Sequence, residues 1–292
     1  MRILALGLLL AMLCAACENP AQYSQKKEQE NVSGKTVVLV HGYSKGPADM
    51  HTLADFLKKA GYSPVTVDLP LTFDHVQEAA EIFEKKVGKI LSELPDNESI
   101  AMVGHSTGGL VIRYFLSHSG DCRRVDRAIL IAAPNQGSRL AGMAGEISDL
   151  LVETFATLDS LRPEKISELA LDDPKETRIG AIAGNKDDLA LGRLLENEND
   201  GRVEVGSVYY PGLDDFIVLP YNHNEIHHRE KTAALVIRFL ESGRLSKCGF
   251  LRKSGSDGSL RRKVMSKMTE ELIFYGDDLK IANSGDMILI SK

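Results

Sequence analysis

A serine stands at the centre of the pattern Gly104-His105-Ser106-Thr107-Gly108, after an apolar run and before a stretch with helical spacing. Where such a pattern joins a strand to a helix, the sharp turn strains the serine backbone and raises its hydroxyl above the sheet. A side chain at position 104 or 108 would collide in that turn, so glycine is needed there. The amide N–H groups that open the following helix face any oxyanion formed beside the serine. We therefore expect Ser106 to be a nucleophile.

Short apolar runs and amphipathic stretches alternate on both sides of this turn. The runs that predict strands are residues 37–40, 65–68, 100–103, 128–132, 179–182 and 216–219. The stretches with helical spacing are residues 50–60, 76–94, 110–116 and 231–240. Continuously apolar strands that alternate with such helices indicate a mostly parallel sheet covered on both faces. We expect an α/β domain over residues 35–243, with its functional loops at the carboxyl ends of the strands.

Residues 35–243 resemble an α/β-hydrolase of the lipase and esterase type. The resemblance rests on the G-x-S-x-G turn, on His41-Gly42-Tyr43 after the first strand and, less specifically, on the Pro-x-x-Gly-Ser loop of residues 134–138. It implies an oxyanion hole formed by the backbone N–H groups of Tyr43 and Thr107. It also implies that the acid and then the base follow Ser106 along the chain.

The interval of residues 138–173 interrupts the alternation. Its apolar side chains recur at helical spacing in two groups. Two interpretations stay open, because periodicity shows that a face is apolar without showing what covers it. The segment is either a pair of helices packed on the sheet or a helical cap over a binding site.

A serine nucleophile needs a base, and four histidines follow Ser106: His118, His223, His227 and His228. His118 falls at the far end of the nucleophile helix. His223 follows the last strand after a short loop, where the resemblance places the base. The next two histidines fall in a helical turn that we expect to be solvated. We therefore expect His223 to be the base, with His227 as the substitute.

The base needs a carboxylate that fixes its tautomer and stabilises the imidazolium. Asp200 stands in an Asn-Asp-Gly sequence followed by an apolar residue two positions later, 23 positions before the base, which resembles the lipase arrangement. Asp187 or Asp188 follows the fifth strand closely, as the acid does in many members of the fold. Asp214 and Asp215 precede the last strand and so lie on its wrong side. We choose Asp200 and keep Asp187 as the alternative.

His223 and His227 stand four positions apart, a spacing that also occurs in zinc sites. The metalloprotease motif needs glutamate directly after its first histidine, and Asn224 occupies that position. We expect no metal and no organic cofactor to serve the reaction.

The first sixteen residues have the organisation of a signal peptide, with one basic residue and then an apolar stretch too short to cross a bilayer permanently. The small residues before Cys17 resemble a bacterial lipobox, which implies lipidation of Cys17. Residues 17–34 then form a polar tether. We expect a lipoprotein anchored to a membrane of the bacterial cell envelope, and the alternative is a secreted or periplasmic protein cut after Ala16.

Residues 244–292 differ in charge from the body. They hold ten Lys and Arg against six Asp and Glu, whereas residues 17–243 hold 24 basic and 35 acidic groups. A basic linker, solvated or in contact with anionic lipid, precedes three apolar runs that predict a small β appendage. Cys122 and Cys248 would pair in an oxidising compartment, which would tie this extension to the body.

Composition indicates a globular protein and argues against a nucleic-acid-binding one. The 292 residues are 43% hydrophobic and 26% charged with a net charge of -6, which is globular and gives no overall nucleic-acid footprint. We expect a hydrolase that cleaves acyl or lipid esters. An acyltransferase or thioesterase with the same triad is the alternative, and a non-catalytic envelope lipoprotein is a third possibility. The sequence does not indicate the oligomeric state.

Overall fold

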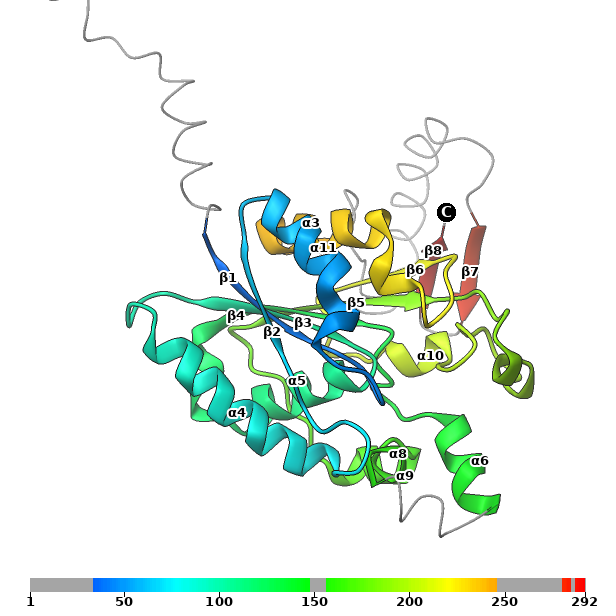
Figure 1. The fold of residues 1–292 in the computed structure, drawn as a ribbon. Coiled ribbons are helices and arrows are strands. Elements are labelled where there is room, and N and C mark those ends of the chain that lie inside the picture. The colour runs from blue at the N-terminus through cyan, green and yellow to red at the C-terminus, as the bar shows by residue number, and fades with distance from the viewer. Residues whose placement is uncertain (1–33, 148–155, 246–279, 285–286, 292) are drawn as a thin grey trace, which may run out of the picture.

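A computed structural model describes residues 34–147, 156–245, 280–284 and 287–291, and Figure 1 shows its sheet with helices on both faces. Six parallel strands make up most of the sheet: β1 (Thr36–Val40), β2 (Ser63–Val67), β3 (Ile100–His105), β4 (Val125–Ile131), β5 (Arg178–Gly184) and β6 (Asp215–Leu219). They stand in the order β2-β1-β3-β4-β5-β6. The nucleophile follows β3, so it lies at the carboxyl edge in the middle of the sheet.

Alternate side chains of the strands build two separate cores, because successive residues of a strand point to opposite faces. Val38 and Val40 of β1 belong to one core, and Val37 and Leu39 belong to the other. All five residues of β1 and all six of β3 are buried. The runs at 37–40 and 100–103 therefore correspond to strands covered on both sides, whereas β2, at the edge of the sheet, is only partly buried.

Two helices cover each face of the sheet. On one face lie α4 (Val76–Ser92) and α5 (Thr107–His118), and on the other lie α3 (His51–Lys59) and α11 (Glu230–Ser242). Short turns of 3-10 helix connect the elements: η1 (Pro47–Met50), η2 (Gly120–Arg124), η3 (Ala190–Leu194) and η4 (Ile226–His228). A further short helix, α10 (Val205–Val208), packs near β5.

Two elements begin three residues before their predicted starts. β4 begins at Val125 because the polar side chains that follow find partners at the amino edge of the sheet. Lys35 pairs with Asp126, and Arg127 donates to the Leu240 carbonyl. α5 begins at Thr107, directly after the nucleophile, because its first turn is built from glycines that apolar spacing does not reveal. A Cβ at Gly109 would lie 2.5 Å from the Cβ of Ala133.

The interval of residues 138–173 contains α6 (Arg139–Ile147), α8 (Ala156–Ser160) and α9 (Pro163–Glu168). Leu161, Ile166 and Leu169 are buried in the same core as α4 and α5. The Ser160 hydroxyl accepts a hydrogen bond from the backbone N–H of Val76, at the start of α4. α8 and α9 therefore pack on the body, and α6 begins against it, because Ala141 is buried in the same core. The rest of the α6 ribbon extends away from the sheet (Figure 1). The interpretation of residues 138–173 as a cap over a binding site stays a prediction.

The C-terminal residues add a hairpin to the sheet. β7 (Lys280–Ser284) and β8 (Met287–Ser291) pair antiparallel, and β8 pairs parallel with β6 at Val218 and Ser291. Two of the three predicted runs correspond to this hairpin, while the run at 272–275 lies outside the described residues. The predicted signal, Cys17 and Cys248 also lie outside them, so lipidation and the pairing with Cys122 stay predictions. Among the described residues, no helix is long and apolar enough to span a membrane.

Candidate active site

Ser106 occupies a strained turn at the carboxyl end of β3. Its backbone has φ 53° and ψ -126°, a region that residues with a side chain rarely adopt. Its N–H donates to the Ile131 carbonyl at 2.8 Å, which ties the turn to β4. A Cβ at Gly104 would lie 2.5 Å from the N of Gly109, and one at Gly108 would lie 2.4 Å from the carbonyl oxygen of His41. Both glycines are therefore required by close backbone contacts.

His223 lies in the loop after β6 and contacts both Ser106 and Asp200. The Ser106 hydroxyl donates to His223 Nε2 at 2.9 Å, and His223 Nδ1 donates to Asp200 Oδ2 at 2.7 Å. The His223 backbone N–H also donates to the Asp200 carbonyl at 2.9 Å. All three residues are buried, and Asp200 is fully so. The structure thus brings together the three residues that the sequence predicts as nucleophile, base and acid.

The Asp200 carboxylate is held by its own loop. Its Oδ1 accepts the backbone N–H groups of Arg202 at 3.0 Å and Val203 at 2.8 Å, which leaves Oδ2 for His223. The turn requires Gly201, whose φ is +90°. Hydrogen bonds from amides to a carboxylate are charge-assisted, so they stabilise the negative charge of this buried group.

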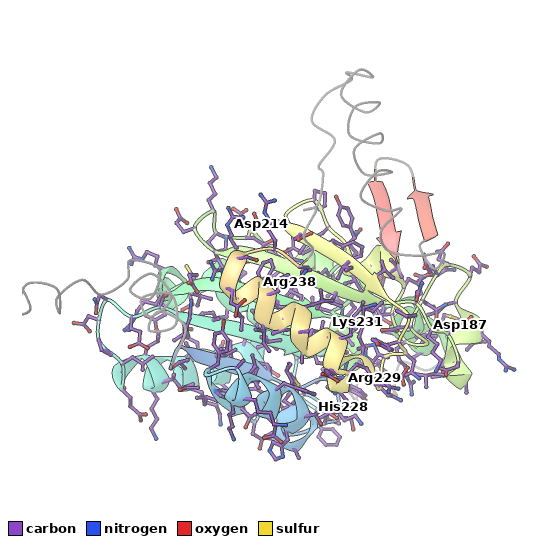
Figure 2. The ribbon with its side chains drawn as sticks, turned by 90° about the horizontal axis from the view of Figure 1, so that it is seen from above. Asp187, Asp214, His228, Arg229, Lys231 and Arg238 are labelled. Carbon is purple, nitrogen blue, oxygen red and sulfur yellow. The ribbon has the colours of Figure 1, made fainter. Side chains whose placement is uncertain are left out.

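Asp188 and Asp214, which the sequence also offered, have other partners. Asp188 pairs with Lys186 at 2.7 Å and accepts from the Asn222 amide at 2.8 Å. Asp214 accepts the backbone N–H of Ile179 at 2.8 Å, at the amino edge of the sheet. Figure 2 shows Asp214 near one end of α11, with Asp187 toward the other end. Of the carboxylates considered, Asp200 is the one in contact with His223 Nδ1.

The turn expected to supply the oxyanion hole lies against the nucleophile. A Cβ at Gly42 would lie 3.0 Å from the Cβ of Ser106. His41 is fully buried and fixes the turn, because its Nε2 accepts the N–H of Leu69 at 3.1 Å. Burial raises the pKa of the Tyr43 hydroxyl, so this side chain is a neutral phenol at physiological pH. The roles of the Tyr43 and Thr107 amides stay predictions.

Two histidines differ from what the sequence suggests. We expected His227 to be solvated, and this is wrong: it is 1% exposed, because η4 packs against α3 and α11 and places His227 Nε2 3.0 Å from Asp49 Oδ2 of η1. His105 was not singled out, yet its Nε2 donates to the His223 carbonyl at 3.0 Å. Burial, with the nearby His227 and His223, holds the pKa of His105 well below its usual value. The position of His105 inside the G-x-S-x-G turn is the sequence feature that could have indicated its contact with the His223 loop.

Comparison with known proteins begins with the first half of the chain. Residues 15–172, more than half of the 292, match a family model described as a domain of unknown function, DUF7379. The chain belongs to this family. The matched residues include Ser106 and the turn at Tyr43, and they end before Asp200 and His223. The family description therefore assigns no activity to the site.

Comparison with individual relatives and solved structures identifies the fold. The chain is 34% identical over 109 residues to a putative methylesterase 14 of Arabidopsis thaliana, a match that spans 36% of this chain and about a third of that relative. A Bacillus licheniformis lipase in mature form is 21% identical, covers 71% of this chain and 91% of its own, and has a TM-score of 0.60. Phospholipase PlaB from Legionella pneumophila is 18% identical over 88% of this chain and 68% of its own, with a TM-score of 0.56. The chain has the α/β-hydrolase fold of lipases and esterases.

Proposed function

We propose that this member of the family hydrolyses carboxylic esters of acyl or lipid substrates, with Ser106 as nucleophile, His223 as base and Asp200 as acid. The observation that carries the proposal is the continuous hydrogen-bonded path from the Ser106 hydroxyl through both ring nitrogens of His223 to Asp200 Oδ2, at 2.9 and 2.7 Å. Nucleophile and base within hydrogen-bond reach, with the base oriented by a third group, is the signature of an activated serine.

In the first half of the reaction, Ser106 Oγ attacks the ester carbonyl carbon and its proton passes to His223 Nε2. The N–H groups of Tyr43 and Thr107 stabilise the oxyanion. The bond to the alcohol oxygen breaks, and the leaving alcohol takes the proton from Nε2. In the second half, water attacks the acyl-enzyme while His223 takes its proton and returns it to Ser106 Oγ. Asp200 stabilises the imidazolium in both halves.

The alcohol and acyl parts of the substrate are best found with a panel of esters. The relative named a putative methylesterase motivates methyl esters, and the solved lipase and phospholipase motivate longer acyl chains and phospholipids. Chromogenic esters of increasing acyl length, with and without added alcohol acceptors, measure both chain preference and the balance of hydrolysis and acyl transfer. Release of free acid as the main product is the expected result.

The decisive variant is Ser106→Ala, which removes the nucleophile without adding bulk. We expect kcat/KM to fall by several orders of magnitude, on the order of 10⁴ to 10⁶, with unfolding free energy close to wild type. Intact mass after reaction with a fluorophosphonate should show one adduct on the wild-type chain and none on the variant. Near-wild-type esterase activity in Ser106→Ala would refute the assignment.

We also propose that the protein is a lipoprotein of the bacterial cell envelope, anchored through Cys17. The support is the resemblance of the residues before Cys17 to a lipobox, and attached acyl chains give stable anchoring because each buried methylene contributes about 0.8 kcal/mol. Labelled palmitate should enter the wild-type protein in bacterial cells. Equal labelling of Cys17→Ser would contradict the proposal.

A further inference from the structure

A second group of buried polar side chains lies next to His223 and takes no part in the proposed reaction. Asp49 comes from η1, His105 ends β3 and His227 lies in η4, so three separate elements converge. One ligand atom from each lies within 4.8 Å of the other two. The side chains of His105 and His227 are almost fully buried, and that of Asp49 is 14% exposed.

The distances between these donors suit a single small cation. His227 Nε2 lies 3.0 Å and His105 Nδ1 lies 3.9 Å from Asp49 Oδ2. A zinc ion with bonds of about 2.0–2.1 Å in tetrahedral geometry separates neighbouring donor atoms by about 3.4 Å. The two distances bracket that separation, so binding requires small movements of side chains and no movement of the strands.

Two buried nitrogen atoms in the group lack a partner among the described residues: His105 Nδ1 and His227 Nδ1. The other nitrogen of His105 donates to the His223 carbonyl, which fixes the tautomer and leaves a lone pair on Nδ1. Histidines that bind metals commonly donate their second N–H to a backbone carbonyl in this way. An unpartnered buried nitrogen is costly, and a metal ion would satisfy that of His105.

We propose that Asp49, His105 and His227 bind one divalent transition-metal ion, with zinc the best match to two imidazoles and a carboxylate. Calcium and magnesium prefer oxygen ligands alone, so this donor set disfavours them. His228 lies at the outer side of the group, where η4 meets α3 (Figure 2), with Nε2 3.7 Å from Asp49 Oδ1 and a side chain 36% exposed. It supplies the fourth ligand or gives way to water.

Binding requires one ring to turn, and it requires the proton on His227 Nε2 to move to Nδ1 so that Nε2 has a free lone pair. The rings of His105 and His227 are stacked with centroids 3.7 Å apart and 22° between their planes, so their lone pairs do not yet point at one position. The torsion that turns an imidazole about its Cβ–Cγ bond is broad, which makes this rotation inexpensive. The bound ion would be linked to the loop of His223 through the His105 ring, and it would not contact Ser106.

The test uses the full chain without an affinity tag, with its cysteines alkylated so that thiolates cannot bind metal. Zinc alone is titrated in competition with a chromophoric chelator, and cobalt(II) is titrated separately by visible absorption. We expect one ion per chain and the cobalt spectrum of a four- or five-coordinate site. Ser106→Ala should bind equally well, which separates this site from the proposed hydrolase chemistry.

Two variants locate the site. Asp49→Asn and His227→Asn should each weaken zinc binding by at least about tenfold, and His118→Asn, at the exposed end of α5, should leave it unchanged. Circular dichroism checks that each variant is folded. Absence of stoichiometric zinc binding by the wild type would overturn the proposal. Wild-type affinity in folded Asp49→Asn or His227→Asn would overturn it too, because the ion would then bind elsewhere.

Discussion

Two pairs of aspartate and histidine, one of them buried and the other partly exposed at Asp49, lie side by side at the carboxyl edge of this sheet. Asp200 holds His223 at 2.7 Å, and Asp49 holds His227 at 3.0 Å, with the two histidines four positions apart. The pairs differ in the second nitrogen of each ring. That of His223 accepts the Ser106 hydroxyl, while that of His227 has no partner among the described residues. We therefore expect the same two residue types to support different chemistry according to the third group that they meet.

The two carboxylates also differ in what holds them. Asp200 is fully buried and accepts two backbone N–H groups of its own loop. For Asp49, burial alone would raise the pKa, but the hydrogen bond with His227 together with the nearby His227, Lys45 and His228 outweighs burial, so the pKa is lowered. Asp200 is thus fixed by the backbone, whereas Asp49 depends on side chains that can rearrange.

The largest difference between the pairs should appear when each carboxylate is made neutral. Asp200→Asn should lower kcat/KM by on the order of 10⁴, because an amide stabilises neither the required tautomer nor the imidazolium of His223. Steady-state kinetics with a chromogenic ester measures this. A loss of less than about tenfold would remove Asp200 from the triad and return Asp187 to consideration.

A smaller change should disturb the Asp200 pair through the backbone. A Cβ at Gly184 would lie 2.4 Å from the Tyr221 carbonyl oxygen and 2.9 Å from the Cβ of Asp200. Gly184→Ala should therefore move the two loops apart, destabilise the fold by about 2–3 kcal/mol and lower kcat by about 10²-fold. Urea unfolding and kinetics report both effects.

The matched control is Gly88→Ala, in the middle of α4. There the nearest atom to an added Cβ is 3.8 Å away, so the higher helix propensity of alanine should stabilise the protein by up to about 1 kcal/mol. If Gly184→Ala instead has wild-type kinetics, the Asp200 loop tolerates displacement. The backbone would then fix Asp200 no more firmly than side chains fix Asp49.

The two pairs also differ in how far the sequence predicts them. Asp200 lies in a turn with a local signature, and His223 follows a strand whose apolar run is evident, so both could be proposed from neighbouring residues. His227 is hydrogen-bonded to Asp49, 178 positions away, and no local sequence pattern indicates such a contact. The strands and long helices were predictable for the same reason as Asp200, since their periodicity is local. The early start of α5 was not, because glycines in tight contact carry no periodicity.

His105 and His228, which lie near the two pairs, should make the free energy of unfolding depend on pH. The pKa of folded His105 is well below 6.5, so at lower pH the unfolded chain binds a proton that the folded chain does not. As the pH drops below 6.5, this group should therefore lower the free energy of unfolding by up to about 1.4 kcal/mol per pH unit. Above pH 6.5 His105 should leave the free energy of unfolding unchanged. The pKa of His228 is also lowered, mainly by burial, and acts in the same direction.

The variant His105→Asn isolates that contribution, because asparagine retains a donor for the His223 carbonyl. Its stability deficit relative to wild type should shrink between about pH 7.5 and about pH 5.5, as measured by urea unfolding. A deficit of His105→Asn that is constant across this range would show that His105 is protonated equally in both states.

The smallest effect on rate should come from Asp49→Asn in metal-free protein. The amide oxygen still accepts a hydrogen bond from His227 Nε2, but the charge is lost, so we expect a destabilisation of about 1–3 kcal/mol. The rate should fall less than tenfold, because the path from Ser106 to Asp200 remains intact and only the support of His105 beneath the His223 loop is weakened. Thermal unfolding and kcat/KM measured on the same preparation separate the two. A loss of rate as large as that of Asp200→Asn would mean that both Asp–His pairs take part in the reaction. The group that contacts the second ring nitrogen of each histidine would then not decide what the pair does.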